Sequence, residues 1–329
     1  MNKASLTDSF GRTHDYLRLS LTDACNLRCR YCMPHEEVSV TPKAHLMQVD
    51  EIAHLARLFV DLGVKKIRLT GGEPLVRKDF PEILKVLSLL PVELSLSTNA
   101  ILIDRHVEQL KQVGLKHINI SLDSLDSEQF RQMTLRNDFQ KVSENLQLLL
   151  NEDFRVKINV VVMRGVNENS LSEFVEYTRH HDLDVRFIEF MPFEQNGWNP
   201  EQVLSYQEML DNLNREFPQI TRLKDPKHST AKHYQVKGFK GKFAFISTIT
   251  APFCDSCNRL RLTADGKMKN CLFSQGESDL LSALRQGKDP EILIRENLAL
   301  KSRERGGRFD STELKGNDTE NRSMIKIGG

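Results

Sequence analysis

The chain has 329 residues, with 46 Lys or Arg against 45 Asp or Glu, so its formal net charge at pH 7 is +1. That length allows one domain of barrel size, or one domain with a smaller companion. A near-zero charge excludes the large basic field that non-specific nucleic-acid binding needs, and no apolar run of roughly 18 residues exists to span a membrane. Residues 1–16 lack the apolar core of a signal peptide, which favours the cytoplasm.

Short apolar segments alternate with segments of helical length over the first two-thirds of the chain. The strand candidates span 16–22, 65–70, 93–97, 117–122, 157–163 and 184–190, and the helix candidates include 49–62, 104–113, 139–151 and 171–181. Nearly continuous apolar runs are typical of strands covered on both faces, and their alternation with helices indicates βαβ units and a parallel sheet. Six units are too few for a closed eight-stranded barrel. We therefore predict an α/β fold, a partial and partly open TIM-like barrel, with a doubly wound sheet as the alternative.

The pattern changes after about residue 195. Residues 196–200, with the sequence NGWNP, are rich in turn formers and predict a boundary. A helix candidate follows, and then β-like segments over 234–247 and 259–272, the second of which contains the hairpin signature Asp265-Gly266. We expect a first domain over 1–195 and a C-terminal domain over 196–329.

The cysteines fall into two groups of three. The first triad, directly after the first strand candidate, has the spacing CxxxCxxC, and the second has CxxC followed by a third cysteine beyond the hairpin. Their members are Cys25, Cys29 and Cys32 in the first triad, and Cys254, Cys257 and Cys271 in the second. In a chain of this size such close spacing favours metal ligation over disulfide bonds.

The first triad suits an iron–sulfur cluster with an open coordination position. Three thiolates can bind three irons of a [4Fe–4S] cubane, whereas a cluster devoted to electron transfer normally has four cysteine ligands. A zinc site completed by a distant histidine is the alternative. Tyr31, beside Cys32, adds an aromatic surface on which an adenine group could stack. With that aromatic residue, the CxxxCxxC segment closely resembles the radical SAM superfamily.

This resemblance implies S-adenosylmethionine as a cofactor. Its methionyl group would bind the open iron, and one electron would cleave it to methionine and a 5′-deoxyadenosyl radical that abstracts hydrogen. The resemblance assigns cofactor contacts to Tyr31, Gly72, Ser121 and Met191. Judged from the residues alone, the GGEP segment containing Gly72 could be a plain turn, and Ser121 and Met191 could be packing residues. Their positions at or just beyond strand C-termini favour a site.

The spacing of the second triad fits either a zinc ion or an iron–sulfur cluster. For zinc, His228 or His233 could supply the fourth ligand. The order of motifs along the whole chain favours a second cluster. The segments LRLSLTDACNLRCRYCMP, KIRLTGGEPLVRKD and APFCDSCNRLRLTADGK, with the terminal Gly328-Gly329, are similar to those of the GTP 3′,8-cyclase family of molybdenum cofactor biosynthesis. That similarity implies two [4Fe–4S] clusters, one on each triad.

The same resemblance implies GTP as the substrate. It assigns substrate contacts to Arg18, Arg68, Thr98, Lys157, Arg259, Leu260 and Arg261. A triphosphate needs several cations, and the planar fork of Arg suits phosphate oxygens, although each residue alone could be an exposed charge or an ion pair. The composition of 302–322 is typical of a disordered tail, whereas the family inserts the terminal glycines into the active site, where bare backbone can approach a substrate closely.

The reaction implied is a lyase-type cyclisation. The radical would remove the C3′ hydrogen of GTP, and C3′ would then attack guanine C8 to give (8S)-3′,8-cyclo-7,8-dihydroguanosine 5′-triphosphate. The family also implies an electron donor of flavodoxin or ferredoxin type, cyclic pyranopterin monophosphate synthase as the next enzyme, and possible homodimerisation. The alternatives are another radical SAM enzyme with an auxiliary cluster, such as a peptide-modifying maturase, and a non-catalytic metal-binding or electron-transfer protein. Ala100 departs from the family, which commonly has glycine after Thr-Asn, so we expect a differently shaped turn there.

Overall fold

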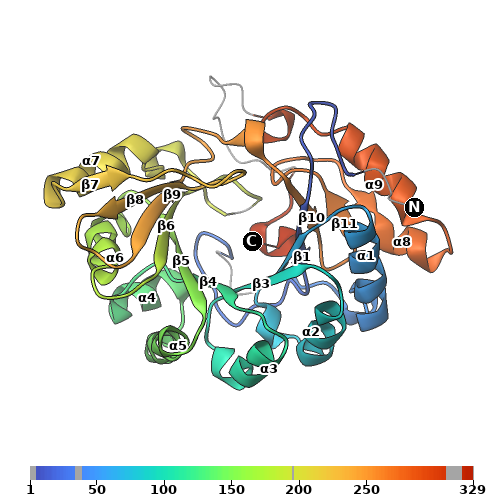
Figure 1. Cartoon of the computed structure of the whole chain (residues 1–329), viewed down its shortest axis with the longest axis horizontal. Coiled ribbons are helices and arrows are strands. Elements are labelled where there is room, and N and C mark those ends of the chain that lie inside the picture. The colour runs from blue at the N-terminus through green and yellow to red at the C-terminus, as the bar shows by residue number, and fades with distance from the viewer. Residues whose placement is uncertain (1–4, 34–38, 195, 309–320, 329) are drawn as a thin grey trace.

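A computed structural model of the chain describes residues 5–33, 39–194, 196–308 and 321–328. Its centre is a run of parallel strands, each joined to the next through helical segments outside the sheet. Their bounds are β1 (Tyr16–Ser20), β2 (Lys66–Thr70), β3 (Glu93–Thr98), β4 (His117–Ser121), β5 (Arg155–Val162) and β6 (Asp184–Glu189). Figure 1 shows these strands as a curved sheet with helices around its outer side and the C-terminus inside the curve. The partial, open TIM-like barrel is confirmed.

The C-terminal part of the chain extends the same sheet at both of its edges. Its strands are β7 (Ile220–Arg222), β8 (Lys232–Val236), β9 (Lys242–Ile246), β10 (Arg259–Leu262), β11 (Lys267–Lys269) and β12 (Ser278–Asp279). β10 pairs in parallel with β1, and β9 pairs in parallel with β6. In the described residues the sheet therefore runs β12-β11-β10-β1-β2-β3-β4-β5-β6-β9-β8-β7. The boundary near residue 195 stays a prediction, since the segments on its two sides share one sheet.

All the described helices except the short C-terminal one cover the outer side of the sheet with their apolar faces, and that last helix lies inside the curve (Figure 1). Their bounds are α1 (Val49–Asp61), α2 (Phe80–Ser88), α3 (Val107–Gln112), α4 (Ser127–Thr134), α5 (Phe139–Asn151), α6 (Leu171–Tyr177), α7 (Tyr206–Glu216), α8 (Leu280–Arg285), α9 (Pro290–Ala299) and α10 (Met324–Ile327). In α1 the buried residues Ile52, Leu55, Ala56 and Phe59 recur at helical spacing. No helix in the described ranges is both long and apolar enough to cross a membrane.

The strands have one apolar and one polar face. In β2, Ile67 and Leu69 belong to the apolar core, while Lys66 and Arg68 line the inner cavity. Side chains alternate along a strand, so the polar set of every parallel strand points to the same inner side. Arg18 is the register partner of both Arg68 on β2 and Arg261 on β10. The inner face therefore carries three arginines abreast, all of which the family resemblance had assigned to the substrate.

Ala100, which follows β3, has the left-handed backbone conformation, with φ of 65°. A residue with a side chain pays a cost there that glycine does not. The buried amide of Asn145 on α5 donates hydrogen bonds to the carbonyls of Ala100 and Ile101, at 2.7 and 3.1 Å. The turn thus keeps a conformation suited to glycine, and Asn145 helps to hold it.

Candidate active site

The first triad lies on the loop after β1, and the loop after β2 holds it. Gly72 donates its N–H to the carbonyl of Thr22 at 2.7 Å, and a Cβ on Gly72 would come within 2.5 Å of the Ala24 carbonyl. Only glycine allows the two loops to approach so closely. Glu73, fully buried, accepts hydrogen bonds from the N–H groups of Leu75 and Asn99. The GGEP segment thus supports the cysteine loop.

The first triad combines free thiols with nearby donors. Burial raises the pKa of Cys25 to about 11 and that of Cys32 to about 12. The Cys29 thiol also has a raised pKa, chiefly from burial, with further contributions from Asp123 and the other two cysteines. The side-chain amide of Asn99 lies 3.9 Å from the Cys25 sulfur. Thiols that are neutral without metal release their protons when metal binds.

The residues assigned to S-adenosylmethionine lie in loops at or beyond the carboxyl ends of β1, β2, β4 and β6. The Tyr31 hydroxyl donates to Asp123 at 2.7 Å, and its ring packs against the cluster that contains Met133, Met163, Phe190 and Trp198. Ser121 is exposed at the end of β4, and Met191 lies two residues beyond the end of β6. Residues that are far apart in the sequence therefore lie at the same edge of the sheet.

The second triad lies before and after the β10–β11 hairpin. Cys254 begins a short 3-10 helix that ends just before Cys257, and Cys271 follows β11. Arg12, from the N-terminal segment, donates to the carbonyl of Cys254 at 2.9 Å and to that of Arg303 at 2.6 Å. The backbone N–H of Arg305 lies 3.4 Å from the Cys254 sulfur. Segments from both ends of the chain thus fix the second triad.

The two triads suit iron–sulfur clusters. All six thiols are free, each triad has half-buried sulfurs, and those of each triad interact electrostatically with one another. Of the two histidines considered for zinc, His233 lies between two carboxylates, with Nδ1 2.9 Å from Asp225 and Nε2 3.4 Å from Asp184. His228 lies beside the second triad, with Nδ1 3.0 Å from the Ser256 carbonyl. Among the described residues, no His, Cys, Asp and Glu side chains form a ligand group for a single metal ion.

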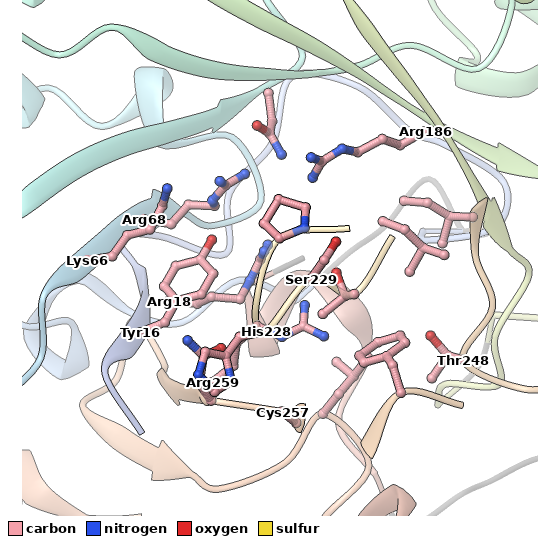
Figure 2. A pocket seen from close by; sticks show the side chains of 18 of the residues that line it. Tyr16, Arg18, Lys66, Arg68, Arg186, His228, Ser229, Thr248, Cys257 and Arg259 are labelled. Atoms are coloured by element: carbon pink, nitrogen blue, oxygen red, sulfur yellow. The ribbon is translucent and has the colours of Figure 1, made fainter. Parts of the chain in front are cut away.

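A cavity of about 680 Å³ lies inside the curve of the sheet. The second triad forms one wall, and the polar face of the strands and the loop over residues 223–231 form much of the rest. Its basic lining includes Arg18, Lys66, Arg68, Lys157, Arg186, Arg259 and Arg261. Figure 2 shows Lys66 and Arg68 on one side of the cavity, with Arg186 facing them and Cys257 at the far end. A compact anion such as a triphosphate matches this arrangement of cations.

The cations in this cavity perturb one another. Burial, followed by the charge of Arg186, lowers the pKa of Lys157 to about 8. Burial, reinforced by the nearby charges of Arg68 and Arg259, lowers the pKa of Arg18 to about 10. Burial opposes ionisation of the Tyr16 hydroxyl, but the surrounding positive charges outweigh it and lower the Tyr16 pKa. The cavity is thus strongly electropositive before any ligand is present.

The described end of the chain enters this cavity. Met324 lines it, Ile325 and Ile327 are buried, and the backbone N–H of Ile325 is hydrogen-bonded to the Cys32 sulfur. Gly328 has φ of 80°, and its carbonyl accepts a 2.6 Å hydrogen bond from Arg261. Residues 324–328 therefore contact both the cavity and the first triad, while Gly329 lies outside the described residues.

The cavity gathers most, but not all, of the residues that the sequence assigned to GTP. Arg18, Arg68, Lys157, Arg259 and Arg261 line it. Two others do not: Thr98 is buried and donates to Glu73 at 2.8 Å, and Leu260 is a fully buried core residue on the other side of β10.

Sequence reasoning missed Lys66, Asp184 and Arg186, and it missed the loop over residues 223–231 that lines the cavity. The first three had a signal. Each is a charged residue at an inward position of an otherwise apolar strand. For the loop over residues 223–231, the spacing of residues gives no signal that it lines a cavity.

Comparisons with known proteins identify the family of the chain. Residues 19–178 match the Radical SAM superfamily model, and residues 183–308 match the Molybdenum Cofactor Synthesis C model. The chain is 45% identical to "GTP 3′,8-cyclase, mitochondrial" of Arabidopsis thaliana, over 98% of this chain and 83% of that protein. It is 38% identical to "GTP 3′,8-cyclase" of Peptoclostridium acidaminophilum, over 100% of this chain and 99% of that protein. The chain belongs to the GTP 3′,8-cyclase family of radical SAM proteins.

Other members of this family are longer. The chain is 47% identical to "Molybdenum cofactor biosynthesis protein 1" of Bos taurus over 98% of its own length, but it spans about half (51%) of that relative. A solved structure of Streptococcus suis SuiB bound to S-adenosylmethionine covers 95% of this chain and 77% of its own, with a TM-score of 0.64 and 14% identity. That likeness concerns the fold alone. Membership of the family brings S-adenosylmethionine and two [4Fe–4S] clusters as cofactors.

Proposed function

We propose that this protein is a GTP 3′,8-cyclase, which converts GTP to (8S)-3′,8-cyclo-7,8-dihydroguanosine 5′-triphosphate in the first step of molybdenum cofactor biosynthesis. One observation carries the proposal. A single cavity has the second triad in one wall and a row of cations on the strands, and the chain's own terminal segment reaches into it. A nucleoside triphosphate has a matching polarity, with a base at one end and several negative charges at the other.

The cations of the inner face would bind the triphosphate. Arg18, Arg68 and Arg261 lie abreast on adjacent strands, and Lys157 and Arg186 approach from the other side of the curve. Arg68 and Arg261 are buried, with side chains held among strand residues, so little conformational entropy remains to be lost when phosphate binds. Several charge-assisted hydrogen bonds from such fixed donors would orient the phosphate chain and, with it, the ribose.

Cys25, Cys29 and Cys32 would hold the first cluster, and Cys254, Cys257 and Cys271 the second. When bound, the first cluster with S-adenosylmethionine supplies the one-electron chemistry that removes the ribose C3′ hydrogen, and the second supplies a Lewis-acidic iron for the purine. Tyr31, Gly72, Ser121 and Met191 would bind S-adenosylmethionine around the first triad. With the purine at one end and phosphates at the other, the chain would hold the ribose between the two sites.

The terminal segment would exclude water and fix the substrate. Met324 in the cavity wall and the buried Ile325 and Ile327 form an apolar cover next to the first triad. Gly328, and we propose Gly329 with it, would approach the substrate through bare backbone. A cover of this kind prevents quenching of a reactive species by solvent or by stray C–H groups.

The proposal is tested by anaerobic incubation of the fully reconstituted chain with GTP, S-adenosylmethionine and dithionite. We expect 5′-deoxyadenosine and a cyclised guanine nucleotide to accumulate together, and neither to form when GTP is replaced by ATP. Formation of 5′-deoxyadenosine without any change in GTP would point to another radical SAM reaction. Protein with about eight irons per chain that forms neither product would overturn the proposal.

We also propose the setting in which the reaction occurs. The electron donor would be of flavodoxin or ferredoxin type, and the product would pass to cyclic pyranopterin monophosphate synthase. The six free thiols support a reducing compartment such as the cytoplasm. A homodimer is the proposed assembly. Sedimentation of the anaerobic protein tests the dimer, and NADPH-driven turnover with a flavodoxin–reductase pair tests the donor.

A further inference from the structure

Asp184 is one of three acidic residues in the described lining of the cavity, with Asp15 and Glu93, and it lies among the proposed phosphate-binding cations. Its Oδ2 accepts hydrogen bonds from Arg186 Nη2 at 2.8 Å and from Arg186 Nε at 3.0 Å, and Lys157 Nζ lies 3.9 Å from the same oxygen. The Asp184 side chain is 7% exposed. A carboxylate in this position fixes the guanidinium of Arg186 through Nε and Nη2 and leaves Nη1 free of this contact. Figure 2 shows the Arg186 side chain directed into the cavity.

His233 reaches this carboxylate from the neighbouring strands. Its Nε2 lies 3.4 Å from Asp184 Oδ2, although His233 is on β8 and Asp184 is on β6. The strand between them is β9, where Ala244 is the register partner of both His233 and Arg186. A larger side chain than Ala244 would occupy the space that the imidazole crosses. The sheet register therefore brings His233 to the wall of the cavity, beside Asp184.

The other ring nitrogen of His233 holds a loop over the same cavity. His233 Nδ1 lies 2.9 Å from Asp225 Oδ1, and the His233 backbone N–H donates to the same oxygen at 3.0 Å. Asp225 belongs to residues 223–231, the loop between β7 and β8, which lines the cavity with Lys224, Lys227 and His228 among others. At its far side the loop meets the second triad's segment through His228 and the Ser256 carbonyl. The loop thus spans the cavity between its two ends.

We infer that His233 is a positioning residue for the triphosphate end of the substrate: it joins Asp184, which orients Arg186, to Asp225, which anchors the loop over residues 223–231. The inference rests on the proposed function, because it names GTP as the ligand. An imidazole between two carboxylates restricts both of them, as partners of this kind do around binding groups in general. Without it, Asp184 can rotate toward Lys157, and Arg186 loses its fixed direction.

The test measures equilibrium binding of GTP, GDP, GMP and guanosine to the full, anaerobically reconstituted chain, without S-adenosylmethionine or reductant. In His233→Ala we expect the GTP dissociation constant to rise about tenfold, as for the loss of a charge-assisted hydrogen bond. The increase in the dissociation constant should be smaller for GDP and GMP than for GTP, and absent for guanosine. His233→Gln, whose amide can still donate to one carboxylate, should recover part of the GTP affinity. His54→Ala, at an exposed position on α1, is the matched control and should bind GTP like the wild type.

A double-mutant cycle shows whether His233 acts through Arg186. In an Arg186→Ala background, His233→Ala should weaken GTP binding by less than it does in the wild type, because only the contribution of the loop over residues 223–231 remains to be lost. Full additivity of the two changes, or an equal loss for GTP and guanosine, would overturn the inference, and so would unchanged GTP binding by His233→Ala. Melting temperatures and guanosine binding of each variant monitor folding. A wild-type chain that binds guanosine and GTP equally weakly would instead overturn the proposed function, on which the inference depends.

Discussion

Arg261 donates a 2.6 Å hydrogen bond to the carbonyl of Gly328, although 67 residues separate them in the sequence. Arg261 is buried on β10, beside the inner arginine Arg18 of β1. Gly328 lies against Ser20 and Thr70 at the ends of β1 and β2. The contact therefore links the terminal segment to the same row of cations that we propose for the triphosphate.

Gly328→Ala should abolish cyclisation while leaving both clusters in place. An added Cβ would lie 2.6 Å from Thr70 Oγ1 and 2.9 Å from Ser20 Cβ, and φ of 80° is unfavourable for alanine. Gly287→Ala is the matched control, since Gly287 has φ of 70° but nothing within 4 Å of its Cβ position. It should lose about 1 kcal/mol of stability and no activity. Rates of nucleotide formation and iron content measure the difference; wild-type turnover by Gly328→Ala would contradict the assigned role.

The affinity for GTP should fall as pH rises through about 8. Burial and the charge of Arg186 lower the Lys157 pKa to about 8, so the ammonium is present below this pH and is lost above it. Bound phosphate favours the charged lysine, so the fall should begin near the pKa of the free protein and continue above it. In Lys157→Arg, which keeps its charge over this range, the fall of GTP affinity near pH 8 should disappear. The affinity for guanosine should not change with pH in this range. An identical pH profile in Lys157→Arg would assign the titration to another group.

Arg12→Ala should loosen the second cluster selectively. The Arg12 guanidinium joins the carbonyls of Cys254, Ser302 and Arg303, and its own partner is Asp8 at 2.7 Å. Without these hydrogen bonds, the loop that contains Cys254 is no longer linked through Arg12 to Ser302 and Arg303. Brief exposure to air should reduce iron from about eight to about four per chain, while wild-type protein loses less. Arg57→Ala, on α1, is a suitable control, and equal iron loss in the two variants would count against this role.

Replacement of the three second-triad cysteines by alanine should remove the second cluster and leave the first cluster intact. We expect about four irons per chain, a cluster signal that still changes on addition of S-adenosylmethionine, and no cyclised nucleotide. The first triad contacts its own supporting loop through Gly72 and Glu73, so its cluster should assemble independently. Loss of both clusters in this variant would show that the triads depend on each other for assembly.

The central strands and the cysteine triads were predictable from the sequence because local signals specify them. The segment predicted as a strand over 184–190 is β6, Asp184–Glu189, and the helix predicted over 139–151 is α5 with the same bounds. Apolar strand runs and close cysteine spacing need no knowledge of distant residues. The GTP contacts stay predictions, and two of the residues assigned from resemblance, Thr98 and Leu260, do not line the cavity.

The remaining features depend on pairing between distant segments. Neither periodicity nor spacing reveals that β9 and β10 extend the two edges of one sheet, or that Ala244 lies between His233 and Arg186. The contact between Asp184 and His233 follows from that register. Residues at inward strand positions, such as Lys66 and Arg186, could have been found by reading alternate positions separately within each apolar run.

Transfer of a hydrogen isotope from GTP tests the central claim most directly. GTP deuterated at C3′ is incubated anaerobically with the reconstituted chain, S-adenosylmethionine and dithionite, and the 5′-deoxyadenosine is analysed by mass spectrometry. The account predicts one deuterium in 5′-deoxyadenosine and its absence from the cyclised nucleotide. Unlabelled 5′-deoxyadenosine alongside GTP that keeps all its deuterium would contradict it.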